Sequence, residues 1–260
     1  QNRIHAYVEI AYGLRSLFMV QPGLGRREFS EAVSQLGVDQ RYPGVKNVAF
    51  TRYVRAEQRA AFEQRVRADR SLDPRGYPDF AIRPPGDRDE YFVADYLWPL
   101  RGSESVHGLD ISAQPANLAS MRYARDSGQP VASGPFDLLQ EVSERTGFVV
   151  RVPVFSALPT APSQTPEPAS FLGSVAVTMR VLDLFQNLER EGMLRGMGVA
   201  WTDEGSPLSS PSAAGAGLPM YSSLKPGITD RREFSQVLRV YGRDWQMDFP
   251  SVEPRRAGGL

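Results

Sequence analysis

Two charged residues near the middle of the chain could orient a small ligand. Asp110 lies between a predicted strand at residues 91–98 and a predicted helix at residues 112–127, so its carboxylate could point over the open end of a sheet. A carboxylate in a dry pocket accepts N–H groups with strong directionality. Arg151 interrupts an apolar strand predicted at residues 148–155, and an arginine on a central strand normally needs an anion.

Several partners are open for these two side chains. Arg151 could pair with Asp110, could bind the carboxylate of a ligand, or could lie on the solvent face if the strand register turns it outward. Asp110 could instead be a surface residue that caps the helix after it. We expect both to face one cavity, opposite Tyr96 and Met121, and to decide together which ligand is accepted.

The sequence shows no apparatus for catalysis. The histidines, His5 and His107, are too few for a metal site, which needs at least three protein ligands. Cysteine is absent, which excludes thiolate catalysis, and no glycine-rich phosphate or dinucleotide motif is present. Asp87, Asp89 and Glu90 cluster at the start of a strand, where solvation or ion pairing is the ordinary role of carboxylates. We therefore expect no enzyme activity, no cofactor and no metal.

Composition indicates a globular chain of one large or two small domains. Its 260 residues are 41% hydrophobic, enough for a substantial core. The formal net charge is zero, so nucleic acid is a disfavoured partner. No apolar run approaches the ~18 residues that span a bilayer, and no signal peptide begins the chain, so we expect this segment to be soluble as written.

Hydrophobic periodicity predicts an α/β fold in which strands alternate with single helices. The predicted helices lie at residues 1–20, 26–37, 55–71, 112–127 and 181–191. The predicted strands lie at residues 45–54, 80–82, 91–98, 129–136, 148–155, 171–178 and 197–202, with closing strands from residue 220, at 234–241 and at 245–249.

Two segments lack periodicity. Residues 156–168 are rich in proline, serine and threonine and are the best candidate for a domain boundary. Residues 205–217 form a serine, proline, alanine and glycine tract, which we expect to be mobile and functionally silent.

Several short motifs, in their shared order, resemble the CHASE domain, the extracytoplasmic sensor module of plant cytokinin-receptor histidine kinases and of many bacterial histidine kinases and diguanylate cyclases. The motifs are Asp89-Glu90-Tyr91, Gly108-Leu109-Asp110, Ala124-Arg125-Asp126-Ser127-Gly128 and Pro153-Val154-Phe155, with residues 42–50 upstream and 241–245 downstream. The resemblance spans nearly the whole chain.

The resemblance implies a long N-terminal helix followed by two PAS-like α/β subdomains with mixed or antiparallel sheets. Residues 1–40 would form the stalk helix and a short helix. Residues 41–155 would form the membrane-distal, ligand-binding subdomain, and residues 156–255 the membrane-proximal one. The segment would be the periplasmic part of an inner-membrane receptor of a two-component system or cyclase, with its two flanking transmembrane helices cut away.

The resemblance also implies a set of pocket residues. Asp110 is placed like the aspartate that hydrogen-bonds the adenine ring of cytokinin in plant receptors, and Tyr96 like an aromatic of the pocket wall, although a core tyrosine is equally open. Ala132 matches a leucine whose main chain contacts ligand, with Ser133, Gly134 and Phe136 on the same wall and Met121 facing it. Arg151 stands where the plant pattern has threonine, so amino acids and organic acids stay open beside cytokinin or adenine-like ligands.

We expect a small-ligand sensor domain that forms a homodimer through the apolar band of residues 1–20. The same band could instead pack on its own domain. Two alternatives to the sensor stay open: a dimerising module that transmits force without a ligand, and a hydrolase that the motifs do not reveal.

Overall fold

The computed structural model describes residues 2–21, 23–141, 143, 145–156, 170–194, 197–206, 217–224 and 232–250. Most of the predicted boundary segment, from residue 157 onward, lies outside the described residues. Residues 207–216 do so too, and the expected mobility of that segment therefore stays a prediction.

The helices and strands follow the predicted alternation. The α-helices are α1 (Asn2–Val20), α2 (Arg26–Gln35), α3 (Val38–Arg41), α4 (Arg59–Ala68), α5 (Pro115–Ser127) and α6 (Val181–Arg190), with 3-10 turns η1 (Ala56–Gln58) and η2 (Ile111–Ala113). The strands are β1 (Val45–Arg55), β2 (Glu90–Trp98), β3 (Val131–Ala132), β4 (Phe136–Asp137), β5 (Thr146–Phe155), β6 (Phe171–Arg180), β7 (Ala200–Asp203), β8 (Leu218–Ser222), β9 (Arg232–Val240) and β10 (Arg243–Pro250).

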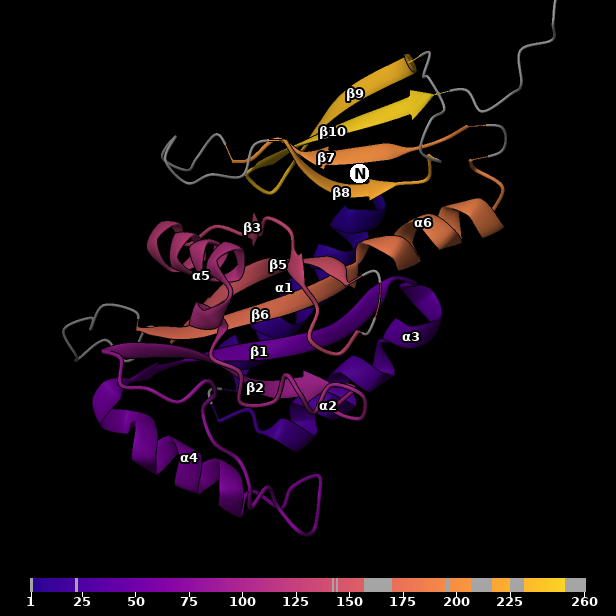
Figure 1. Cartoon of the computed structure of the whole chain (residues 1–260). Helices are drawn as coiled ribbons and strands as arrows, with labels where there is room; N and C mark the ends of the chain where they lie inside the picture. Colours follow the sequence, from indigo (N-terminus) through magenta and orange to yellow (C-terminus); the bar gives the residue numbers. More distant parts are fainter. Residues whose placement is uncertain are drawn as a thin grey trace, which may run out of the picture.

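Two antiparallel sheets carry the fold. The first is six-stranded, in the order β2-β1-β6-β5-β3, with β4 paired to β5; the second is four-stranded, in the order β8-β7-β10-β9. In Figure 1 the second sheet, orange to yellow, lies above the first. Helix α5 lies beside β3, on the side of the first sheet that is nearer the second sheet. The predicted class, α/β with antiparallel sheets after a long N-terminal helix, is confirmed.

The division between the sheets differs from the predicted one. Residue 156 follows β5, yet β6 beyond it pairs with β5 along most of its length, with Val150 opposite Val177. The first sheet therefore continues to the end of β6, and the second sheet begins after α6. Sequence could not place this division, because a loop without periodicity can connect two neighbours in one sheet as readily as two subdomains.

A single large core holds α1 and both sheets together. Tyr7, Val8, Ile10, Ala11, Leu14 and Phe18 of α1 are all buried in it. Phe148 of β5 contacts the rings of Trp201 and Trp245 in the second sheet, at centroid distances of 5.6 and 5.1 Å. The apolar band that we considered for dimerisation is thus occupied by the chain's own core.

Local signals explain two boundaries near the candidate site. The predicted stop of α5 at Gly128 is confirmed, because this residue has a φ of 67°, which glycine adopts without strain. The predicted start at Ser112 is wrong: residues 111–113 form η2, and α5 begins at Pro115, whose fixed φ suits a first helical position. The strand predicted at 80–82 is also absent, since the backbone N–H of Ile82 donates to the Glu63 carboxylate at 3.1 Å instead of to a neighbouring strand.

Candidate functional site

Strand alternation places Arg151 on the face of the first sheet opposite α1. Phe148, Val150 and Val152 of β5 point into the core with α1. Arg151 lies between them in sequence and so points to the other face. That face is covered by η2, α5 and the segment around β4, and Arg151 is only 1% exposed. The solvent-facing alternative for Arg151 is therefore excluded.

The guanidinium of Arg151 is held by neutral oxygens. Its Nε donates to the Ser120 hydroxyl at 3.0 Å, and Nη1 donates to the hydroxyls of Ser174 at 3.1 Å and Thr51 at 3.4 Å. Nη2 donates to the side-chain oxygen of Asn117. Among the described residues, no carboxylate pairs with this cation. Four neutral acceptors orient the group but do not neutralise it.

Burial lowers the pKa of Arg151 to about 9, because the charged form loses its hydration. The side chain is still a cation at neutral pH. A buried cation without a counter-ion is costly unless an anion joins it. Among the described residues, the site thus holds one positive charge that no carboxylate compensates.

A small cavity, the inner cavity, adjoins Arg151. Its volume is about 40 Å³. Its polar lining residues come from strands, from the α5 region and from the turn after β4: Asn47, Thr51, Gln114, Asn117, Gln140, Arg151 and Thr178. A water molecule occupies about 30 Å³ in the liquid, so this volume suits a carboxylate group but not a whole organic ligand.

A larger hollow, the outer cleft, lies next to the inner cavity. Its volume is about 730 Å³, within the usual range of ligand sites. It is bounded by α5, by the segment from β3 to β4, and by Leu218 and Arg243 of the second sheet. The predicted wall residues Ala132, Ser133, Gly134 and Phe136 all line it.

Asp110 does not line either of these hollows, and the cavity predicted for Asp110 together with Arg151 is not formed. The carboxylate is fully buried at the start of η2 and faces β2. Its Oδ1 accepts the backbone N–H groups of Phe92 and Ser112, both at 3.1 Å, and Oδ2 accepts the Ser112 hydroxyl at 2.5 Å.

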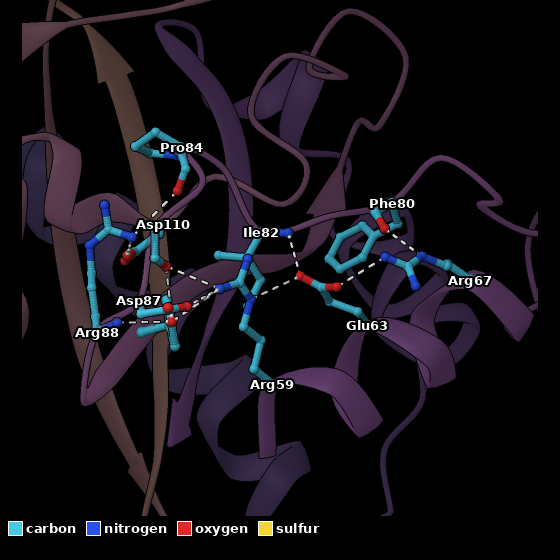
Figure 2. Close-up of polar contacts among 11 residues, drawn as sticks. Arg59, Glu63, Arg67, Phe80, Ile82, Pro84, Asp87, Arg88 and Asp110 are labelled. Atoms are coloured by element: carbon cyan, nitrogen blue, oxygen red, sulfur yellow. Dashed lines mark hydrogen bonds and ion pairs between the residues drawn. The ribbon is translucent and has the colours of Figure 1, made fainter. Parts of the chain in front are cut away.

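A nearby arginine adds an ion pair to this arrangement. Arg88 lies 3.6 Å from Oδ2 of Asp110 and also donates to the Pro84 carbonyl (Figure 2). Asp110 is thus the cap of η2, as the alternative role proposed, but a buried one. The 3-10 turn that begins after it directs the carboxylate back toward β2.

Tyr96 and Met121 also lie away from the two hollows. Tyr96 is the cross-strand partner of Phe50, so it shares the α1 face with it, and its hydroxyl donates to the Leu24 carbonyl at 3.3 Å. Met121 is fully buried against Phe92 and Ile111. Both side chains pack in the core. For Tyr96 this is the alternative of a core tyrosine that the sequence left open.

Sequence reasoning missed the residues that hold Arg151. Asn117 and Ser120 are polar residues three positions apart that also share the face of Met121 and Ala124 in the buried part of α5. Ser174, which accepts from Arg151, alternates with Val175 and Val177 in β6. The available signal was the presence of polar residues on faces that periodicity predicts to be buried. Such residues indicate that another buried polar group forms hydrogen bonds with them.

Comparisons with known proteins agree with this architecture. The family model of the CHASE domain matches residues 22–214. No curated protein sequence matches the chain. No helix among the described residues is both long and apolar enough to cross a bilayer.

Two solved structures are similar to this chain to different degrees. An extracellular ligand binding receptor from Desulfohalobium retbaense DSM5692 is 14% identical with a TM-score of 0.54; the match covers 96% of this chain and 37% of that one. The ligand binding domain of the Pseudomonas aeruginosa PAO1 amino acid chemoreceptor PctC, solved in complex with GABA, is 13% identical with a TM-score of 0.47, covering 96% of this chain and 92% of that one.

The chain thus spans little more than a third of the length of the Desulfohalobium receptor. Its two antiparallel sheets, its N-terminal helix and the family match over residues 22–214 agree with one another. The chain therefore belongs to the CHASE domain family, whose members are extracytoplasmic sensor domains.

Proposed function

We propose that this domain senses a small organic acid, whose carboxylate pairs with Arg151, on behalf of a transmembrane histidine kinase or diguanylate cyclase. The supporting observation is the buried guanidinium with neutral partners beside the inner cavity. A ligand carboxylate would supply the missing charge and a bidentate acceptor for the guanidinium.

A cytokinin or adenine-like ligand is less well supported. In plant receptors the resemblance assigns the adenine contact to an aspartate at the position of Asp110. Here both oxygens of Asp110 accept hydrogen bonds from the protein's own backbone and from Ser112. An acid is the better match, because the charged group that lacks a counter-ion among the described residues is the Arg151 cation.

Matched acids and amides would test the proposal. Acetate, propionate and glycine would be compared with acetamide, propionamide and glycinamide by thermal shift and calorimetry. A ligand at 100 times its Kd stabilises the folded state by about 2.7 kcal/mol. We expect stabilisation by acids and not by their amides. Equal effects of both series, or no effect of either, would contradict the proposal.

A pair of variants would assign binding to Arg151. Arg151→Met removes the buried cation while keeping a long side chain, and such replacements are often tolerated. We expect it to fold and to lose acid binding. Arg75→Met is the matched control, because Arg75 is 86% exposed and should bind acids as the wild type does.

We also propose that the domain binds without catalysing a reaction, because the polar groups around Arg151 are amides and hydroxyls without a base beside them. Turnover of a generic ester or phosphate substrate by the purified domain would contradict this.

Dimerisation remains a proposal of its own. Since the buried band of α1 is occupied, a dimer contact on this helix would use its exposed positions, such as Ala6, Glu9, Gly13 and Ser16. These recur every three or four residues, as a helix pair requires. Light scattering that shows a strict monomer at high concentration would contradict this proposal.

A further inference from the structure

We infer that the ligand is an amphipathic monocarboxylic acid whose carboxylate lies at Arg151 and whose apolar body lies in the outer cleft. This inference rests on the proposed function and extends it to the size and polarity of the ligand. Its physical basis is that the inner cavity and the outer cleft are two parts of one site.

The two hollows share part of their walls. Gln114, Phe136 and Leu139 line both of them. Ser120 lines the outer cleft and accepts the hydrogen bond from Nε of Arg151. The cation is therefore one side chain away from the outer cleft, and the shared residues form part of the wall between the two volumes.

The shared wall is weakly held. Asn117 accepts from Arg151 and donates to the side-chain oxygen of Gln114 at 2.8 Å. Gln114 in turn donates to the backbone carbonyl of Asp137 at a long distance of 3.3 Å, across from α5 to β4. Leu139, at the mouth, is 43% exposed. Moving the Gln114 side chain out of the wall breaks these two hydrogen bonds, both between neutral groups, which is a modest cost.

The outer cleft is suited to an apolar body. Much of its lining is aliphatic or aromatic, including Ala116, Ala119, Tyr123, Val131 and Leu218. Burial of such surface favours binding by about 0.8 kcal/mol for each methylene group.

The outer cleft offers no second free cation among the described residues. Its arginine, Arg243, is paired with the fully buried Asp203, at 2.8 Å from Nε and through a second contact from Nη2. A dicarboxylate would therefore have one charge without a partner, which selects a monocarboxylic acid. Because Leu218 and Arg243 belong to the second sheet, an acid in the cleft would contact both sheets at once.

A series of straight-chain acids from acetate to octanoate would test the inference by calorimetry on the purified domain. Affinity should rise about threefold to fourfold with each added methylene group. The corresponding alcohols, which lack the charge, should bind much more weakly at every length.

A variant that fills the outer cleft would locate the apolar body. Ala119 is exposed on α5 and lines only the outer cleft, so Ala119→Trp should weaken octanoate binding by about tenfold or more and leave acetate binding unchanged. Ala61→Trp, on the exposed face of α4, is the matched control and should change neither. Circular dichroism would verify that both variants fold.

The outcomes separate the two proposals. If acetate binds through Arg151 but affinity does not rise with chain length, this inference fails and the proposed function stands. If affinity rises but Ala119→Trp leaves octanoate binding intact, the apolar body lies elsewhere and the inference also fails. If no acid binds, or Arg151→Met binds acids as the wild type does, the proposed function fails and the inference fails with it.

Discussion

Arg151 donates a hydrogen bond from Nη2 to the side-chain oxygen of Asn117, so a buried cation contacts a neutral amide where a carboxylate would neutralise it. Asn117 comes from α5 and Arg151 from the middle of β5. An acid that enters the inner cavity would take over the role of anion beside them. A carboxylate at position 117 would therefore give Arg151 a counter-ion from the protein itself.

Asn117→Asp should supply that internal anion. We expect the variant to be more stable than the wild type by about 1–3 kcal/mol, because a charge-assisted hydrogen bond replaces a neutral one. We also expect it to lose acid binding, since Arg151 then has its counter-ion. Urea unfolding and calorimetry measure the two effects. Asn117→Ala is the control: it should lower stability, and acid binding should persist in it. Unchanged acid affinity in Asn117→Asp would contradict a role of Arg151 in binding.

Asp110→Ala should destabilise the fold by about 2–4 kcal/mol. The change would leave the buried N–H groups of Phe92 and Ser112 without an acceptor and Arg88 without its ion pair. Asp87→Ala, at a fully exposed carboxylate in the same region, should have no measurable effect (Figure 2). A stable Asp110→Ala protein that no longer binds any ligand would instead support the role that the sequence predicted for Asp110.

Much of the fold could be predicted from the sequence, because its strands and helices carry strong local signals. β1, β2, β5 and β6 are β-branched or aromatic runs, and their observed bounds lie within two residues of the predicted ones. The order of strands is a different matter. β6 lies between β1 and β5 in the sheet, and its pairing with β1 joins residues more than a hundred positions apart, which no local pattern contains.

The site could be predicted only in part, for similar reasons. Alternation along β5 showed that Arg151 had to lie on the face opposite Val150 and Val152, but not whether anything covered that face. Its acceptors come from α5, β1 and β6. The direction of the Asp110 side chain depends on the 3-10 turn at residues 111–113. The sequence predicted a helix from Ser112 instead of this turn.

Asp95 is the centre of a buried charge cluster on the α1 side of β2. It accepts from Nη2 of Arg26 at 2.8 Å and from Nε of Arg52 at 2.5 Å. Asp95→Asn would leave two arginines close together with one carboxylate fewer, so we expect a loss of about 3 kcal/mol in the free energy of unfolding. Asp73→Asn, at an exposed ion pair, is the control and should be silent in urea unfolding. A loss no larger than that of the control would show that the cluster relaxes or hydrates when its centre is removed.

His107 should make stability depend on pH. Burial, followed by the charge of Arg26, lowers the pKa of His107 to about 4, against 6.5 for an ordinary histidine. Its Nε2 lies 3.2 Å from Nη1 of Arg26, and its ring contacts Tyr77 and Phe80. Asp95, Arg83 and Asp69 are the other charged groups that act on it. The folded protein therefore holds His107 neutral at a pH where the unfolded chain protonates it.

The unfolded chain binds more protons than the folded one between pH 6.5 and about 4, so stability should fall as the pH is lowered through this window. The carboxylate of Glu63 affects stability at a lower pH. Burial raises its pKa, but hydrogen bonds from Ile82 and Arg59 outweigh burial and hold the pKa below its usual range. The contribution of Glu63 to stability is therefore lost only below the pKa of an ordinary glutamate. Urea unfolding at pH 7.5, 6.5 and 5.5 isolates the histidine. His107→Gln should remove most of the decline, whereas His5→Gln, at an exposed histidine, should preserve it. Equal declines in the wild type and in His107→Gln would show that His107 is protonated in the folded protein, against the effect that its burial and Arg26 predict.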